Sequence, residues 1–291
     1  MTGPVASEKR ALRTITHSGP KNPARFHFAR TRVRRVETIF PAGRSIAESV
    51  AELMHRENCA GGILELSGGR LDPFSFVIPA EDPNKNHAVW YSDTRTCAGG
   101  VSFEKASVSF GLHDGAPFFH CHGLWRTAAG EQLGGHLLPD DNRIVEPVAV
   151  TALLAVDARF ERRFDAETSF ELFAVAGGGQ GEGVLATIRP NVDIISQIEE
   201  LAAATGIRAA HVHGVGSLID MTLADGRSVE SLALEVAIAD GRIVPSGCSV
   251  RVEGLKMAGV GMDGKPFEGE LRRSCNNVCV TFEILLEPAA Q

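Results

Sequence analysis

The sequence has no long hydrophobic run and no C-x-x-C cysteine pair. Its apolar runs are short and interrupted by glycine or charged residues, so none reaches the roughly 18–20 residues that a membrane-spanning helix needs. The N-terminus lacks the apolar core of a secretory signal. Without such a signal, the six cysteines indicate reduced thiols. We therefore expect a cytoplasmic protein with no membrane segment.

Motifs of several common enzyme classes are also missing. The glycine-rich run "AGGGQGEG" (176–183) is not followed by Gly-Lys-Ser/Thr, so it is not a phosphate-binding loop. No G-x-S-x-G occurs, which excludes the usual nucleophile elbow of α/β-hydrolases. The net charge of −7 argues against general binding to polyanions, because neutralising phosphates needs a dense Lys/Arg surface.

One segment has the opposite charge balance. Nine basic residues and no acidic one lie between Lys9 and Arg35. Three interpretations remain open: a solvated arm leading into a strand with outward arginines, an arm that binds nucleic acid, or a targeting peptide.

The chain contains an internal repeat. Residues 41–72 and 190–220 each begin with a proline-led turn, continue as an amphipathic helix and end in a strand and a glycine-containing turn. Ser45 and Glu48 form a predicted capping box in the first helix, and Gly206 is a natural stop for the second. The apolar helix stripes match at an offset of 148 residues: Ile46, Val50 and Leu53 with Ile194, Ile198 and Leu201.

The match resumes farther along the chain. "HDGAPFFHCHGLWR" (113–126) is similar to "MDGKPFEGELRR" (262–273), and "VAVTALLAV" (148–156) is similar to "VCVTFEILL" (278–286). We therefore predict two similar α+β domains, each a mostly antiparallel sheet with a packed helix. Their expected bounds are 25–175 and 184–288, after an N-terminal arm of residues 1–24. The second copy lacks histidines in the matching stretch, so it is expected to act as a scaffold.

Three histidines fall in one predicted hairpin, "PFFHCHGLWRTAAGEQLGGHLL" (117–138). A three-residue loop at 128–130 pairs Thr127 with Glu131 and places His122 opposite His136. His120 lies two residues from His122 and hence on the same face. A β-bulge at Gly134–Gly135 would shift this register by one residue.

Three imidazoles on one patch can bind Zn²⁺ and leave a fourth position open to water, an anion or a carboxylate. Two alternatives remain: a site for an anion or small ligand, and a metal-free set of hydrogen-bonded side chains. Gly134 and Gly135 are candidate ligand-binding residues beside it. Candidate bases for a metal enzyme are Glu131, Asp140 and Asp141.

A second H-x-H lies in copy two, in "AAHVHGVGS". His211 and His213 correspond to Ile63 and Glu65 of the first copy by the same offset. They are either structural, or ligand-binding residues beside the first site or at a subunit contact.

The H-x-H followed by G-G-H-L resembles the signature of the PPC domain, the plants and prokaryotes conserved domain. The preceding helix with "GGILELSGG" and the following "ERRFDAETSFELF" also resemble that domain. The resemblance covers about 25–175 well and about 184–288 more weakly. It implies a compact fold that assembles as a trimer, with His120, His122 and His136 as candidate metal ligands. In plants the domain accompanies DNA-binding AT-hooks, but this chain has no Arg-Gly-Arg-Pro core.

These observations lead to one main functional hypothesis and two alternatives. We expect an oligomeric tandem PPC protein with a histidine-rich metal or small-ligand site, in a regulatory or DNA-associated role. The first alternative is a metal-dependent hydrolase or lyase acting on a small molecule, and the second is a DNA-binding regulator that uses the basic arm. The homotrimer contact is expected at the apolar residues that flank the histidines: Phe118, Phe119, Leu124, Trp125 and Leu137.

Overall fold

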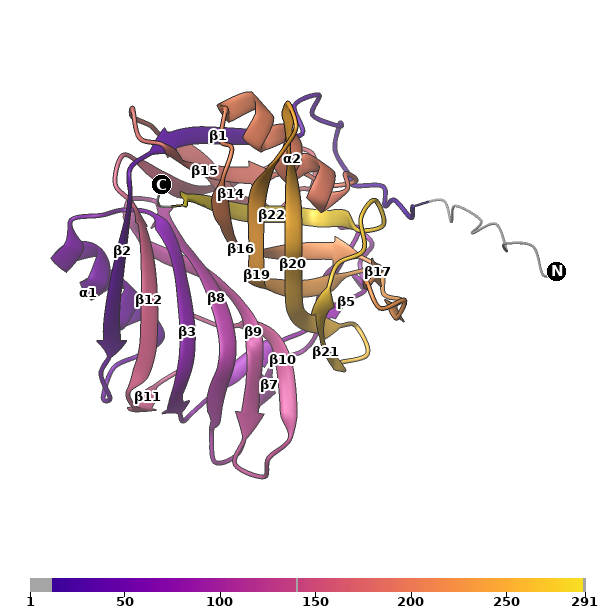
Figure 1. Ribbon diagram of the computed structural model, residues 1–291. Coiled ribbons are helices and arrows are strands. Elements are labelled where there is room, and N and C mark those ends of the chain that lie inside the picture. Colours follow the sequence, from indigo (N-terminus) through magenta and orange to yellow (C-terminus); the bar gives the residue numbers. More distant parts are fainter. Residues whose placement is uncertain (1–11, 140, 290–291) are drawn as a thin grey trace.

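The computed structural model describes residues 12–139 and 141–289, and over these residues the chain is mostly β (Figure 1). Two 12-residue helices, α1 (Ile46–Glu57) and α2 (Ile194–Thr205), are the only ones in this part of the chain. The α+β prediction therefore overstated the helical share. None of the described helices is both long and apolar enough to cross a bilayer.

Two large sheets form the molecule. The first has the order β2 (Val33–Phe40), β12 (Val148–Ala155), β3 (Gly62–Leu71), β8 (Val101–His113), β9 (Ala116–Thr127), β10 (Gln132–Leu137), β4 (Ser75–Val77) and β7 (Arg95–Thr96), and it includes β11 (Ile144–Glu146), β13 (Ala158–Phe164) and β14 (Glu171–Gly177). The second has the order β1 (Phe26–Thr31), β15 (Gly183–Ile188), β22 (Asn277–Pro288), β16 (Ala210–Ile219), β19 (Leu234–Ser246), β20 (Ser249–Gly261) and β21 (Pro266–Glu270). Two small ribbons join β5 (Pro79–Ala80) to β6 (Trp90–Tyr91) and β17 (Met221–Thr222) to β18 (Ser228–Val229).

The helices confirm the repeat predicted from the apolar stripes. They begin 148 residues apart, and all six stripe residues are at most 1% exposed. At the start of α1, the Glu48 amide donates to Ser45 Oγ (3.0 Å) and the Ser45 amide donates to Glu48 Oε2 (2.7 Å), so the predicted capping box forms. At the end of α2, Gly206 has φ +68°, a left-handed conformation that glycine adopts without strain.

The strand order also repeats, and it confirms one of the two sequence matches proposed for the later part of each copy. Residues 148–156 and 278–286 fall on the corresponding strands β12 and β22, whereas the match of 113–126 with 262–273 is wrong. Both sheets share one path, in which β2, β12, β3, β8, β9 and β10 correspond to β15, β22, β16, β19, β20 and β21. The Asp114–Gly115 turn joins β8 to β9, whereas Asp263–Gly264 joins β20 to β21, one hairpin later. The two Asp-Gly turns are therefore not equivalent, because a tight turn is a local signal that recurs wherever a hairpin needs it. The strand counterpart of the histidine hairpin is β20–β21.

The first strand lies in the opposite sheet from the one expected. Residues of β1 fall within the range predicted for the first domain, yet β1 pairs along its whole length with β15 of the second sheet. In Figure 1 the indigo β1 accordingly lies beside β15. The preceding residues also pack on the second copy: His17 is buried and its Nε2 lies 2.9 Å from the Cys279 carbonyl oxygen.

Most of the described basic residues of the N-terminal segment are paired with acidic groups. Its ion pairs join Arg13 to Asp220, Arg25 to Glu167, Arg32 to Asp157, Arg34 to Glu57 and Arg35 to Glu287. Lys9 and Arg10 lie outside the described residues. The pairs reduce the positive charge available for phosphate contacts, which disfavours a nucleic-acid arm.

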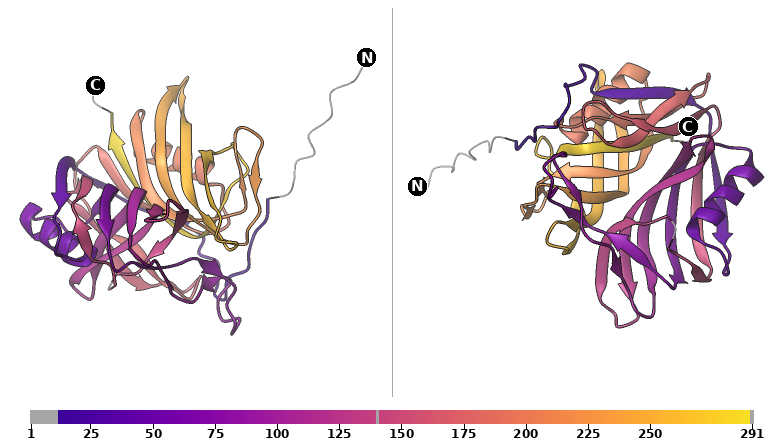
Figure 2. Two further views of the ribbon diagram at one scale, coloured as in Figure 1. Left: turned by 90° about the horizontal axis from the view of Figure 1, so that it is seen from below. Right: turned by 180° about the vertical axis from the view of Figure 1, so that it is seen from behind.

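The two sheets pack face to face, with one helix on each outer side (Figure 2). On the outer side of the first sheet, α1 shares a core with Cys121 and Trp125 of β9. Because side chains alternate along a strand, His120 and His122 point the other way, toward β16, β19 and β22 of the second sheet. The histidine hairpin is thus covered by the other half of the same chain.

Most apolar residues that flank the histidines are core residues. Phe119, Leu124, Trp125 and Leu137 are each at most 3% exposed. Trp125 packs edge-on against the Phe74 and Phe76 rings. These four side chains are therefore closed to a second subunit, and a subunit contact would have to use other surfaces.

Candidate metal site

Strand pairing brings the three histidines together as the hairpin predicted. His136 of β10 is paired directly with His122 of β9, and His120 lies two residues earlier on the same face. The Thr127 amide donates to the Glu131 carbonyl (2.9 Å), which closes the expected loop. Pairing from Gln132 to His136 is continuous, so the bulge considered at Gly134–Gly135 does not occur.

The three imidazoles converge to metal-binding distances. His122 Nε2 lies 3.0 Å from His120 Nε2 and 3.2 Å from His136 Nδ1, and the three nitrogens are all within 4.8 Å of one another. Nitrogens bound tetrahedrally to zinc at about 2.0–2.1 Å lie about 3.3 Å apart. The prediction that these side chains share one site is confirmed, and the donor set suits a zinc-like ion.

The outer nitrogens of two rings are held by acceptors from the second sheet. His122 Nδ1 donates to the Gly216 carbonyl oxygen (3.0 Å), and His120 Nδ1 donates to Glu283 Oε2 (2.7 Å). In neutral rings this places both lone pairs on the facing Nε2 atoms. Two lone pairs at 3.0 Å repel each other unless a cation lies between them. Such outer hydrogen bonds are typical of metal-bound histidines.

Burial favours the form that a metal requires in two of the three rings, those of His122 and His136. It lowers the pKa of His122 well below its usual value, and the neighbouring His120 and His136 lower it further. Burial also lowers the pKa of His136, with further contributions from the charges of His120 and Arg162. Neutral imidazole is the form that ligates a metal.

A buried carboxylate, Glu235 of β19, faces the same point. Its Oε1 lies 3.9 Å from His122 Nε2 and 4.0 Å from His136 Nδ1. Its Oε2 is buried and has no hydrogen-bond partner among the described residues. Burial raises the pKa of Glu235 well above its usual value. An unpaired buried carboxylate is costly, and a cation held by the histidines would compensate its charge.

Sequence reasoning missed both Glu235 and Glu283. The residues that contact the histidines come from copy two, which was expected to be only a scaffold. One signal was available: "LALEVAIA" and "TFEILL" each place a single acidic residue inside an apolar strand. What the sequence alone did not show was that these strands pack on the histidine hairpin.

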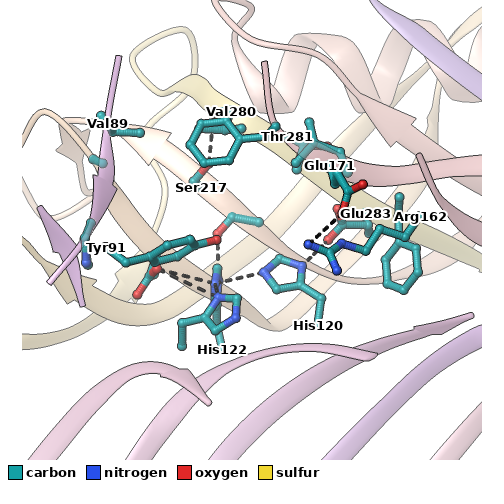
Figure 3. Close-up of a pocket in the computed structure, with 18 of the residues that line it drawn as sticks. Val89, Tyr91, His120, His122, Arg162, Glu171, Ser217, Val280, Thr281 and Glu283 are labelled. Atoms are coloured by element: carbon teal, nitrogen blue, oxygen red, sulfur yellow. Dashed lines mark hydrogen bonds and ion pairs between the residues drawn. The ribbon is translucent and has the colours of Figure 1, made fainter. Parts of the chain in front are cut away.

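A cavity of about 320 Å³ opens beside the three histidines (Figure 3). Its wall is largely aromatic and includes Trp90, Tyr91, Phe118 and Phe170. The Tyr91 ring lies edge-on to His136, with 5.1 Å between ring centroids. This volume is at the low end of the range for small-molecule pockets.

The predicted glycines and bases do not contribute to the cavity. Gly134 and Gly135 are absent from its wall. A Cβ added at Gly134 would lie 2.8 Å from Leu124 Cδ2, and one added at Gly135 would lie 2.3 Å from the Val77 carbonyl oxygen. The two glycines allow close strand packing. Glu131 and Asp141 do not line the cavity, and Asp140 lies outside the described residues.

The second H-x-H forms a different cluster between the sheets. His211 is exposed, whereas His213 is buried. His213 Nδ1 lies 2.7 Å from Glu65 Oε1, and its Nε2 lies 3.1 Å from Glu287 Oε2. Arg35 adds two further bonds to Glu287, at 3.0 and 2.7 Å. We call His213, Glu65, Glu287 and Arg35 the His213 clasp.

Comparison with known proteins places a family match on the second copy. Residues 175–289 match the family model of the Plants and Prokaryotes Conserved (PCC) domain. The histidine hairpin that carries the sequence resemblance lies outside these residues, in the copy where we expected the better match. No curated protein matches the chain.

Several solved structures are similar to about half of the chain. One is a metal-containing protein from Archaeoglobus fulgidus, with 18% identity over 50% of this chain and 97% of that chain, and a TM-score of 0.41. Another is a candidate DNA-binding protein from Ralstonia eutropha JMP134, with 17% identity over 48% of this chain and 90% of that chain, and a TM-score of 0.39. A third is a plant- and prokaryote-conserved protein from Pyrococcus horikoshii, with 21% identity over 50% of this chain and 95% of that chain, and a TM-score of 0.34.

Proposed function

We propose that this chain, which carries a Plants and Prokaryotes Conserved domain over residues 175–289, is a tandem protein of that family that binds one metal ion, zinc by preference, between its two halves. The observation that carries the proposal is the convergence of the three imidazole nitrogens within 4.8 Å, with His122 Nε2 3.0 Å from His120 Nε2. The buried and unpartnered Glu235 oxygen beside them supports it. A cation at this point would be ligated by the imidazoles and would compensate the charge of the carboxylate.

In this proposal residues 25–175 form a first PPC-like domain and 184–288 a second one. The shared strand path and the helices at equal offset support this division, while β1 crosses from one half to the other. The first half supplies His120, His122 and His136. The second half supplies Glu235, and Glu283 to orient His120. Neither half alone contains the complete site.

A second candidate function, a metal-dependent hydrolase or lyase for a small molecule, is favoured by the cavity beside the histidines. A bound zinc ion lowers the pKa of a water in its open position or polarises a carbonyl group. Glu235 Oε2 is the chain's own group for accepting a proton there, because it is buried, unpartnered and next to two of the three ligands. The aromatic wall would exclude bulk water.

The remaining partner expectations stay proposals. A homotrimer is supported by the open edges of the two sheets, and sedimentation equilibrium tests it. A cytoplasmic location also stays a proposal. A regulatory or DNA-associated role has less support, because the net charge is −7 and the described basic residues of the N-terminal segment are largely ion-paired.

Metal analysis of the purified protein tests the main proposal. After incubation with zinc and desalting, we expect one zinc per chain in the wild type and in the control His211→Ala, whose side chain is exposed. His122→Ala and His136→Ala should lose it while keeping the wild-type circular dichroism spectrum. A wild type that holds no metal, or a His122→Ala variant that retains full occupancy, would contradict the proposal.

A further inference from the structure

The cavity has a second charged feature besides its histidines. Arg162 of β13 lines it, and its guanidinium carbon lies 4.8 Å from the centroid of the Phe118 ring. Stacking on a ring fixes the plane of a guanidinium and leaves its edge free for hydrogen bonds. The arginine is thus oriented in the cavity wall before any ligand arrives.

The present partner of Arg162 is replaceable. Its Nη2 lies 3.1 Å from Glu171 Oε2, but the Glu171 side chain is 47% exposed. An ion pair with one partner so open to water contributes little, and Glu171 can turn to solvent without burying its charge. The guanidinium can then accept a carboxylate through two parallel N–H donors, the geometry in which arginine binds carboxylates most strongly.

The rest of the cavity suits an apolar body. Trp90 and Phe170 stack with centroids 5.4 Å apart, and Tyr91 continues this wall to His136. The volume of about 320 Å³ excludes large ligands such as dinucleotides. Among the described residues that line the cavity, Arg162 is the one arginine or lysine, so the wall offers a pairing site for one carboxylate.

We propose that the cavity binds a small monocarboxylic acid with an aromatic body, whose carboxylate is held by Arg162 and whose ring packs on Trp90, Tyr91 and Phe118. The inference names the ligand class of the proposed metal site, and it rests on that proposal only in assigning the cavity to ligand binding.

Calorimetric titration of the zinc-treated protein with phenylacetate tests the inference, with phenylacetamide and acetate as matched probes. We expect phenylacetate to bind at least about tenfold more tightly than either, because one probe lacks the charge and the other lacks the ring. Arg162→Gln should lower the phenylacetate affinity about tenfold, and Arg162→Lys should lower it less. The neighbouring Arg163→Gln is the control, since its side chain is 62% exposed.

Two further measurements separate this inference from the metal proposal. Metal content is measured on each sample, and His122→Ala should keep phenylacetate affinity within about threefold, because Arg162 rather than the metal holds the carboxylate. A protein that holds zinc but binds phenylacetate no better than phenylacetamide would overturn the ligand class alone. Affinity lost in His122→Ala but kept in a folded Arg162→Gln variant would overturn the role of Arg162. A folded wild type that holds no zinc yet prefers phenylacetate through Arg162 would overturn the metal proposal alone.

Discussion

Two clusters of histidine and glutamate join the two sheets, and they differ in which atoms face one another. At the three-histidine cluster, imidazole nitrogens face each other and the buried carboxylate of Glu235 has an oxygen without a partner among the described residues. In the His213 clasp, both ring nitrogens of one histidine face carboxylate oxygens, at 2.7 and 3.1 Å. The first cluster lacks a positive charge that the second already contains.

The protonation of the histidines follows this difference. Burial lowers the pKa of His122, and its histidine neighbours lower it further. Burial also acts to lower the pKa of His213, but hydrogen bonds to Glu287 and Glu65 outweigh it and raise the pKa. These shifts favour the charged form of His213 and the neutral form of His122. The two clusters thus differ because of the groups that surround their histidines, and not because of the residue types that form them.

The largest expected difference between the clusters appears on acidification. Zinc affinity should fall by at least about tenfold per pH unit once histidine ligands must lose protons to bind it. Because the pKa values of His122 and His136 are lowered, zinc should still be bound at pH 6 and released well below that. Zinc competition titrations from pH 7.5 to 4.5 measure this. Zinc release that begins above pH 6.5 would mean that the histidines are not held neutral.

Removing a carboxylate should have opposite effects at the two clusters. Glu235→Gln should lower zinc affinity by about 10–100-fold and, without metal, raise the free energy of unfolding by about 1 kcal/mol or more. Glu287→Gln should destabilise the protein and leave zinc affinity unchanged, since Glu287 is ion-paired to Arg35 and His213. Urea unfolding with and without chelator checks both. A Glu235→Gln variant with a lower free energy of unfolding than the wild type in chelator would contradict the opposite effects expected at the two clusters.

The His213 clasp should stabilise the fold over a defined pH range. His213→Gln should lower the free energy of unfolding by about 2 kcal/mol at pH 6. The pKa of His213 is raised in the folded protein, so its contribution is complete below pH 6.5 and is lost as the pH rises through the folded value. Unfolding curves at pH 6 and pH 9 should therefore differ between wild type and variant at the lower pH and converge at the higher one.

Acid should weaken the His213 clasp through its carboxylate. Hydrogen bonds from His213 and Arg35 lower the pKa of Glu287 to about 2, so its contribution to the free energy of unfolding is present above pH 4.5 and is lost as the pH falls toward 2.

The smallest expected effect is that of Arg35→Gln, which should lower the free energy of unfolding by about 0.5 kcal/mol, because the arginine side chain is 43% exposed. Thermal unfolding at pH 6 in low and high salt measures it, and zinc content should not change. A loss of stability as large as that in His213→Gln would contradict this expectation, since it would mean that Arg35 contributes as much to the His213 clasp as His213 does.

The local half of the metal site could be predicted from the sequence. Strand alternation places His120 and His122 on one face, and the hairpin loop sets His136 opposite His122. Likewise, apolar spacing and capping residues predicted both helices. Each of these features depends on residues close together in the chain, where periodicity and turn length fix the geometry.

The non-local half could not be predicted in the same way. Glu235 and Glu283 reach the histidines only because the second sheet packs on the first, at a separation of more than one hundred residues. The pairing of β1 with β15 also depends on sheet closure rather than on the local pattern, since β1 would alternate equally well on either sheet. Asp-Gly turns suggested a false equivalence because the repeat had kept its strand order but not its turn sequences.

The crossing of β1 sets an order of events during synthesis. Residues 26–31 leave the ribosome early, but their partner strand, residues 183–188, is made more than 150 residues later. Until then the first sheet can form from its own hairpins, while residues 26–31 have no partner strand for their backbone hydrogen bonds. The pairing of β1 with β15 therefore closes a long loop and ties residues 26–31 to the second half of the chain. A nascent chain released before residue 188 would keep an unpaired strand able to join another chain, so truncated products should aggregate more readily than the complete protein.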